Sequence, residues 1–374
     1  MSDAAAPVSP AILDLVRSKR VLVLCGAGGV GKTTTSAALA LAGAQAGRRV
    51  LVLTIDPARR LAEALGLPPQ SPVPVPVGVE RLRAAGIEGP GTLDAWMLDP
   101  RVVFERVIKK LAAPDKAAII LESRLYRHLT ELVAGMQEYT AAEALYELSE
   151  SKQYDLIVLD TPPSRNALDF LDAPGRLGRF LDDGIVQLFI PKEGGGLLRR
   201  AGRFVSGVFS RVFGETFVEE LQLFLGAFSG TFAALRQHTE GVRALLASGD
   251  AAFLLVTSPE EAALREALYF RGQILQRALP FAGFLLNRSM AKPDDLPHPS
   301  DLSHRAEHPG LRAALQKLGA LADREQAQAE RDRSLLRRLQ ALAGPAGLAV
   351  AAPHLGGAVE DLPGLLRLAR GIAG

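Results

Sequence analysis

The sequence of 374 residues contains a single cysteine, Cys25, which excludes an internal disulfide and any cysteine cluster for zinc or a soft metalloid. An excess of one charge is also missing, because 43 Lys and Arg against 41 Asp and Glu leave +2. So small a net charge indicates no nucleic-acid-binding face. No uninterrupted apolar run of about 18 residues occurs, and the N-terminal segment does not resemble a secretory signal. We therefore expect a cytoplasmic protein.

Short apolar runs recur along the chain and alternate with helical patterns. The expected strands are 21–25, 50–55, 93–98, 156–160, 253–257, 281–287 and 348–352. Runs that are apolar on both faces are typical of a buried parallel sheet. Their alternation with helices predicts an α/β fold: a doubly wound, mostly parallel sheet of the P-loop type, with ligands at the carboxyl ends of the strands.

Two stretches do not follow this rhythm. Residues 187–248 contain no credible strand and are rich in phenylalanine, so we expect a helical subdomain there. It would be inserted between two parts of one nucleotide-binding α/β core, 1–186 and 249–374. Residues 311–342 are highly charged and predict a long exposed helix or a helical pair. The segments 65–79 and 291–309, which are rich in proline, are expected to be loops.

A phosphate-binding loop follows the first expected strand. The loop reads Gly26-Ala27-Gly28-Gly29-Val30-Gly31-Lys32-Thr33 and continues through Thr34 into an alanine-rich helical run. Glycines leave the backbone N–H groups open to a phosphate, and the helix adds its positive end. Lys32 is predicted to reach the β- and γ-phosphates of ATP, and Thr33 to hold Mg²⁺ through its hydroxyl.

Two aspartates follow later strands at the same expected edge of the sheet. Asp56 opens an Asp-Pro-Ala-Arg-Arg turn, and Asp160 ends the run Leu-Ile-Val-Leu-Asp. Either acid alone could be a strand-end cap. With the loop, however, Asp160 matches a Walker-B-like strand whose carboxylate orders Mg²⁺.

These motifs together resemble the arsenical-pump ATPase family of deviant-Walker-A ATPases, which includes the factor that guides tail-anchored proteins to membranes. Three later features also match. They are the Thr257-Ser-Pro-Glu helix start, Asn287-Arg288 at a strand end, and Pro353 before the Asp361-Leu-Pro-Gly turn. The resemblance implies that Asp56 positions or deprotonates the attacking water, and that Asp160 senses the metal and the γ-phosphate. It also implies that Asn287, followed by Arg288, reads the adenine base, and that Pro353 with the Asp361-Leu-Pro-Gly turn belongs to the closing nucleotide loop.

The sequence departs from the family pattern at two places. The family's second lysine, which reaches a dimer partner's phosphates, is replaced by Ala27, and switch II reads Asp160-Thr-Pro-Pro-Ser-Arg-Asn without glycine or histidine. A missing trans-acting cation predicts slow hydrolysis. Alternatively, Arg59, Arg60 or Arg165 could compensate in a homodimer, or a lysine-bearing paralogue could do so in a heterodimer.

The phenylalanine-rich segment leaves three interpretations open. Phe209, Phe213 and Phe217 repeat every fourth residue and are followed by Phe224, Phe228 and Phe232 on one helical face. This face could pack within the subdomain or against a dimer partner. It could also form a groove for a hydrophobic protein client, or, with nearby arginines, bind an anionic membrane peripherally.

The sequence therefore favours an ATP-hydrolysing molecular switch whose dimer closes around Mg-ATP and handles a client. An arsenite pump motor is disfavoured, because As(III) is soft and requires thiolates. A positioning or regulatory scaffold ATPase with little turnover is the competing function. His298, His304 and His308 lie in a proline-rich segment and do not predict a metal site.

Overall fold

The computed structural model describes residues 10–54, 60–68, 71–123, 126, 136–161, 211, 214–229, 231–291, 298–303, 308–357, 359 and 361–373. Several sequence predictions therefore lie outside the described residues. They concern Asp56, Arg59, Arg165, the altered switch after Thr161, His304, and most of the phenylalanine-rich segment.

The core is one eight-stranded sheet in the order β3-β4-β2-β5-β1-β6-β7-β8. All neighbouring strands are parallel except β3 and β4. The strands are β1 (Val21–Cys25), β2 (Arg49–Thr54), β3 (Val75–Pro76), β4 (Thr92–Met97), β5 (Leu156–Asp160), β6 (Ala251–Thr257), β7 (Phe281–Ser289) and β8 (Leu348–Pro353). The predicted parallel α/β sheet is confirmed, with strand ends displaced by two residues at most. The short β3 was missed because it lies within the expected loop 65–79; its proline is tolerated because β3 is an edge strand.

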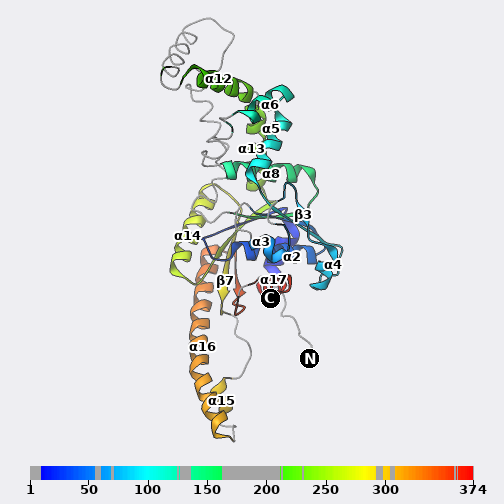
Figure 1. Cartoon of the computed structure of the whole chain (residues 1–374). Helices are drawn as coiled ribbons and strands as arrows, with labels where there is room; N and C mark the ends of the chain where they lie inside the picture. Colours follow the sequence, from blue (N-terminus) through cyan, green and yellow to red (C-terminus); the bar gives the residue numbers. More distant parts are fainter. Residues whose placement is uncertain are drawn as a thin grey trace.

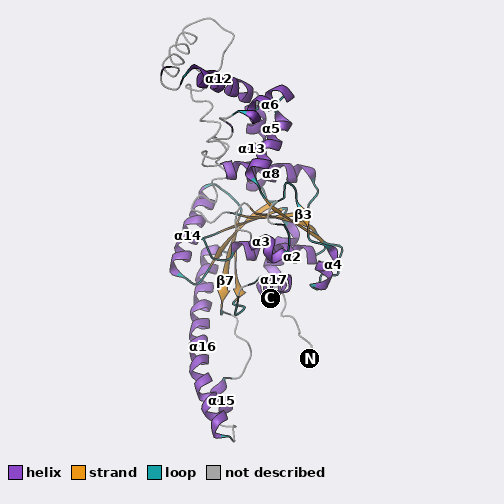
Figure 2. Cartoon of the chain, in the orientation of Figure 1, coloured by secondary structure: helices purple, strands orange, loops and turns teal. Residues whose placement is uncertain are grey.

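Both faces of the sheet are covered by helices (Figures 1 and 2). The helices are α1 (Pro10–Ser18), α2 (Lys32–Gln45), α3 (Arg60–Leu65), α4 (Val79–Ala84), α5 (Pro100–Leu111), α6 (Pro114–Glu122), α8 (Met136–Ser151), α12 (Glu215–Ser229), α13 (Phe232–Ala247), α14 (Glu261–Gln276), α15 (Pro299–Ser303), α16 (Pro309–Ala343) and α17 (Leu362–Ala373). One core joins a sheet face to α1, α2, α3 and α17, and the other joins the opposite face to α5, α8, α13 and α14. Successive side chains of a strand point to opposite faces, so strands buried on both sides are apolar throughout.

The helical region between β5 and β6 contains α12 and α13 in its described part. α12 packs on α6 and α13 packs on α8, so helices that precede β5 share this layer. In Figure 1, α5, α6, α12 and α13 extend beyond α8 on one side of the sheet. On these contacts, the proposed helical subdomain would include α5 and α6 in addition to residues 187–248.

The long charged segment forms a single helix, α16, of 35 residues. Its C-terminal part lies along the sheet, since Asp332 contacts the end of β7 and Gln340 contacts Gly347 and Ala349 at the start of β8. Residues 309–331 must therefore extend past the carboxyl ends of the strands. α15 packs against this extension, and we call the two together the arm (Figure 1).

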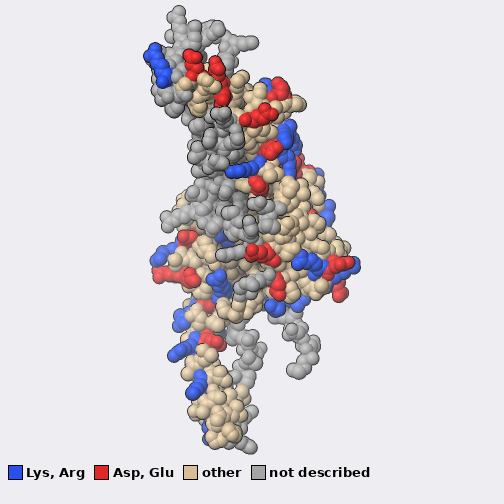
Figure 3. All heavy atoms as spheres, in the orientation of Figure 1, with Lys and Arg blue, Asp and Glu red and all other residues tan. Residues whose placement is uncertain are grey.

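Several apolar side chains are exposed near the far end of the arm. Leu311, Leu318 and Leu321 are each more than half exposed. Figure 3 shows few Lys, Arg, Asp or Glu residues there, in contrast to the charged surface around the sheet. No helix among the described residues has the length and hydropathy needed to cross a bilayer.

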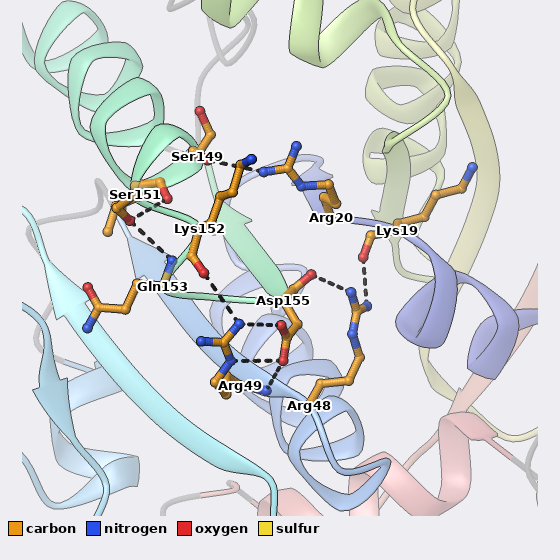
Figure 4. Close-up of polar contacts among 10 residues, drawn as sticks. Lys19, Arg20, Arg48, Arg49, Ser149, Ser151, Lys152, Gln153 and Asp155 are labelled. Carbon is orange, nitrogen blue, oxygen red and sulfur yellow. Dashed lines mark hydrogen bonds and ion pairs between the residues drawn. The ribbon is translucent and has the colours of Figure 1, made fainter.

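At the amino-terminal edge of the sheet, arginine side chains bind backbone carbonyl oxygens and the Asp155 carboxylate (Figure 4). Arg49 binds Asp155 through both carboxylate oxygens, at 3.2 Å from Nε and 2.7 Å from Nη2. Arg48 donates to the carbonyl oxygens of Val16, Lys19 and Asp155. The carbonyls at the ends of helices lack helical partners, so these arginines satisfy groups that would otherwise be unbonded.

This edge predicts a pH dependence of stability. Hydrogen bonds from Arg49 lower the pKa of Asp155 to about 2 from its ordinary 3.8. A carboxyl group whose pKa is lowered by folding stabilises the folded state at pH values above its pKa in the unfolded chain. This stabilisation is lost as the pH falls through its pKa in the folded state. The gap in urea midpoint between the parent protein and Asp155→Asn should therefore be largest above about pH 4 and narrow toward about pH 2. Asp250→Asn is the control, because it removes a carboxylate that lies 3.9 Å from Arg20. Its urea midpoint should differ less from that of the parent protein. A gap for Asp155→Asn that stays constant with pH would contradict the prediction.

Candidate functional site

The predicted phosphate loop connects β1 to α2 at the carboxyl edge of the sheet. Gly31, with φ +90°, is the residue before the helix, and Lys32 begins it. A side chain at Gly26 would meet the Val256 carbonyl of β6, so only glycine allows this close approach. The Lys32 ammonium lies 2.9 Å from the carbonyl oxygens of both Gly26 and Ala27, and it is buried. Lys32 is thus held across the mouth of the loop, where a phosphate would be bound.

The second predicted element, Asp160, meets the loop directly. Thr33 Oγ1 donates to Asp160 Oδ2 at 2.6 Å, and Thr54 Oγ1 at the end of β2 donates to the same oxygen at 3.0 Å. Asp160 is fully buried. Hydroxyl and carboxylate oxygens are the ligands that Mg²⁺ prefers, so Thr33 and Asp160 fit the predicted metal. Sequence reasoning missed Thr54, which ends a strand beside Asp160.

A cavity of about 650 Å³ opens beside the loop. Its volume is within the range of small-molecule sites. It brings together six predicted residues from distant parts of the chain: Gly31, Thr33, Thr34, Asn287, Arg288 and Pro353. The phosphate loop and the predicted adenine side therefore share one cavity.

Asn287 also contacts the loop itself. Its amide nitrogen donates to the Val30 carbonyl at 2.8 Å, and its side chain is buried. A side chain at Gly31 would collide with that amide. One N–H of Asn287 is therefore engaged with the loop.

Three further parts of the chain line the cavity. The segment after β8 contributes His354, Leu355 and Gly357, α3 contributes Leu61 and Glu63, and α17 contributes Leu365 and Leu368. The first belongs to the closing nucleotide loop that the resemblance implied between Pro353 and the Asp361-Leu-Pro-Gly turn, whereas α3 and α17 were not predicted. No signal marked α3, because its approach to the cavity depends on how the segment after β2 folds.

The structure also places Ala27, His298 and His308, which the sequence singled out. Ala27, at the place of the family's second lysine, is 9% exposed. His298 lies 3.4 Å from Asp323 in the arm, and His308 Nδ1 accepts from Gly310 N at the start of α16. In the described part of the chain, no group of His, Cys, Asp and Glu side chains is arranged to hold a metal ion by itself.

Cys25 is completely buried at the end of β1, and desolvation raises its thiol pKa to about 12. A hydrogen bond with Thr161 and the charge of Lys32 oppose this shift but do not overcome it. Because the thiolate is the reactive form, Cys25 is an inert packing residue.

The parallel sheet, glycine loop and Thr33–Asp160 contact define an α/β protein of the P-loop nucleotide-binding class. The sequence profile of the anion-transporting ATPase family matches residues 19–295. The chain belongs to this family, which confirms the resemblance stated from the motifs.

Bacterial and eukaryotic proteins are similar to the chain. Protein Rv2184c of Mycobacterium tuberculosis is 26% identical over 94% of this chain and 75% of its own length. Protein SCO2128 of Streptomyces coelicolor is 34% identical over 52% of this chain and 45% of its own length. The ATPase GET3 of Malassezia globosa is 29% identical over 48% of this chain and 50% of its own length. The chain thus matches only about half the length of two of these three relatives.

Proposed function

We propose that the protein binds Mg-ATP in the cavity beside the phosphate loop, hydrolyses it, and uses the nucleotide to switch between conformations. The observation that carries this proposal is the junction of Thr33 with Asp160 at 2.6 Å, next to a cavity lined by the loop and Asn287. Membership of an ATPase family supports the reaction.

Each described residue of the site has a task that its position suits. Backbone N–H groups of the loop and Lys32 would bind the phosphates, and Lys32 would exchange its carbonyl partners for phosphate oxygens. Thr33 and Asp160 would hold Mg²⁺, which neutralises charge on the phosphates when bound. Asp56, which follows β2, would position or deprotonate the attacking water.

The wider role that we propose is a dimer that closes around nucleotide and couples closure to a protein or membrane client. We assign the client surface to the phenylalanine-rich region; within its described part, Phe224 of α12 is buried in the core of the protein and is not itself a client contact. A scaffold with little turnover is the second candidate. The buried Ala27 favours it, because no cation is offered from that position to a partner.

The first test concerns the reaction. Lys32→Ala should abolish ATP binding, since it removes the buried cation of the loop. Asp56→Asn should bind ATP but hydrolyse it about 10²- to 10⁴-fold more slowly, the usual contribution of a general base. Lys19→Ala, which changes a lysine at the opposite edge of the sheet, is the matched control for both assays. Parental turnover by Asp56→Asn would refute the role of Asp56.

The second test concerns the base. The remaining N–H and oxygen of Asn287 match the N7 acceptor and the N6–H₂ donor of adenine, whereas guanine presents two acceptors, N7 and O6, at the same edge. ATP should therefore compete for the site better than GTP, and Asn287→Ala should reduce this preference. Competition binding with both nucleotides measures it; equal affinities in the parent protein would rule out base selection by Asn287.

The third test concerns the missing cation. The purified protein alone should hydrolyse ATP slowly, because a trans-acting cation contributes about 10³- to 10⁵-fold to the rate. If Arg59, Arg60 or Arg165 compensates, its change to alanine should slow turnover further without weakening ATP binding. If a paralogue supplies a lysine, its addition should raise the rate instead. Fast turnover by a monomer, unaffected by all three arginine changes, would contradict both alternatives.

A further inference from the structure

The end of β7 is irregular where it reaches the cavity. The register with β8 shifts between Leu286 and Ser289, so Asn287 and Arg288 form a bulge, and Arg288 has φ +56°. Bulges beside functional sites commonly redirect a side chain. A non-glycine residue in the left-handed region persists only when its surroundings fix it. The contacts that fix this bulge therefore determine where Asn287 and Arg288 point.

A buried carboxylate outside the cavity provides those contacts. Asp332 of α16 is 2% exposed. Its Oδ2 accepts from Met290 N at 2.8 Å and from Ser289 Oγ at 3.3 Å, and its Oδ1 accepts from Gln328 Nε2 at 2.7 Å. Burying a carboxylate is costly unless it is hydrogen-bonded, and here two of its three bonds hold the residues directly after the bulge.

Ser289 links the same carboxylate to the other wall of the cavity. Its carbonyl accepts from His354 N at 3.0 Å, and His354 lines the cavity after β8. Its hydroxyl also accepts from Ala291 N at 3.1 Å. A displacement of Asp332 would therefore shift the ends of both β7 and β8, which enclose the proposed adenine side of the cavity.

Asp332 is also the point at which the arm meets the sheet. Residues 309–331 continue the same helix beyond this contact for about 33 Å, at 1.5 Å per residue. A rigid helix transmits a small rotation at one end to its far end. Any change at the bulge caused by a ligand must therefore either strain the Asp332 contacts or move the arm.

We propose that Asp332 is a positioning residue for the nucleotide, which fixes the Asn287–Arg288 bulge and couples occupancy of the cavity to the α15–α16 arm. The inference rests on the proposed binding of Mg-ATP. Coupling between two sites is reciprocal, so the contact that transmits binding to the arm also contributes to binding.

The experiment compares Asp332→Ala with Asp332→Asn. The alanine variant loses all three acceptor bonds and should bind ATP about 5- to 150-fold more weakly, the usual range of site coupling. The asparagine variant should restore binding, since its oxygen can accept from Met290 N and Ser289 Oγ, and its nitrogen can donate to Gln328 Oε1 once that amide turns away from Arg331. Glu330→Ala, an exposed change on the same helix, should bind as the parent does. Binding is measured with a fluorescent ATP analogue.

Hydrogen–deuterium exchange of the arm with and without Mg-ATP provides the second measurement. In the parent protein, Asp332→Asn and Glu330→Ala, binding of Mg-ATP should change the exchange of α15 and of the first half of α16. In Asp332→Ala it should not, even when the site is saturated with Mg-ATP. If Asp332→Ala does not fold, Ser289→Ala replaces it; it removes the hydroxyl bond to Asp332 and should weaken binding less.

The outcomes separate the inference from the function on which it rests. Parental affinity together with a parental arm response in Asp332→Ala would overturn the role of Asp332 and leave ATP binding intact. An asparagine variant as defective as the alanine variant would also overturn it. If the parent protein itself fails to bind Mg-ATP, and behaves like Lys32→Ala, the proposed function is wrong.

Discussion

The hydrogen bond between Thr33 and Asp160 depends on the neighbourhood of two parallel strands. β5 pairs with β1 so that Asp160 stands opposite Leu24, one residue before the end of β1. The loop after β1 and the carboxylate that ends β5 therefore meet at one edge, although 127 positions separate Thr33 from Asp160. β2 adds Thr54 from the other side of β5. Without this strand order, the motifs would be present in the chain but not assembled into a site.

The two edges of the sheet are specialised differently. At the amino-terminal edge, Arg48, Arg49 and Asp155 bind one another and the carbonyls that end helices, so their polar groups are engaged in structure. At the carboxyl edge, Lys32 and Thr33 contact groups that a nucleotide and its metal could replace. This division is the usual one for parallel α/β sheets, in which ligands lie beyond the carboxyl ends of the strands. It allows stability and binding to be altered separately.

The cavity has a second wall, built by β7 and β8, whose form comes from an irregularity rather than from regular pairing. The bulge at Asn287 and Arg288 directs both residues to the cavity, and Asn287 also binds Val30 of the loop. Asp332, from a helix that otherwise projects away from the sheet, holds the residues after the bulge. The Asn287 side of the cavity, the loop and the arm are thus parts of one hydrogen-bonded unit.

The sequence by itself determined the parallel sheet, because strands buried on both faces must be apolar throughout, and it determined the loop, because glycine spacing is a local requirement of phosphate binding. Lys32, Thr33 and Asp160 were predicted for this reason. The placement of Asp332 and Thr54 beside the site was decided only by tertiary structure. A buried aspartate in a charged helix reads like its exposed neighbours, because its partners Ser289 and Met290 lie some forty residues earlier in the chain. Whether that carboxylate faces solvent or the sheet depends on the packing of α16, which no local pattern encodes.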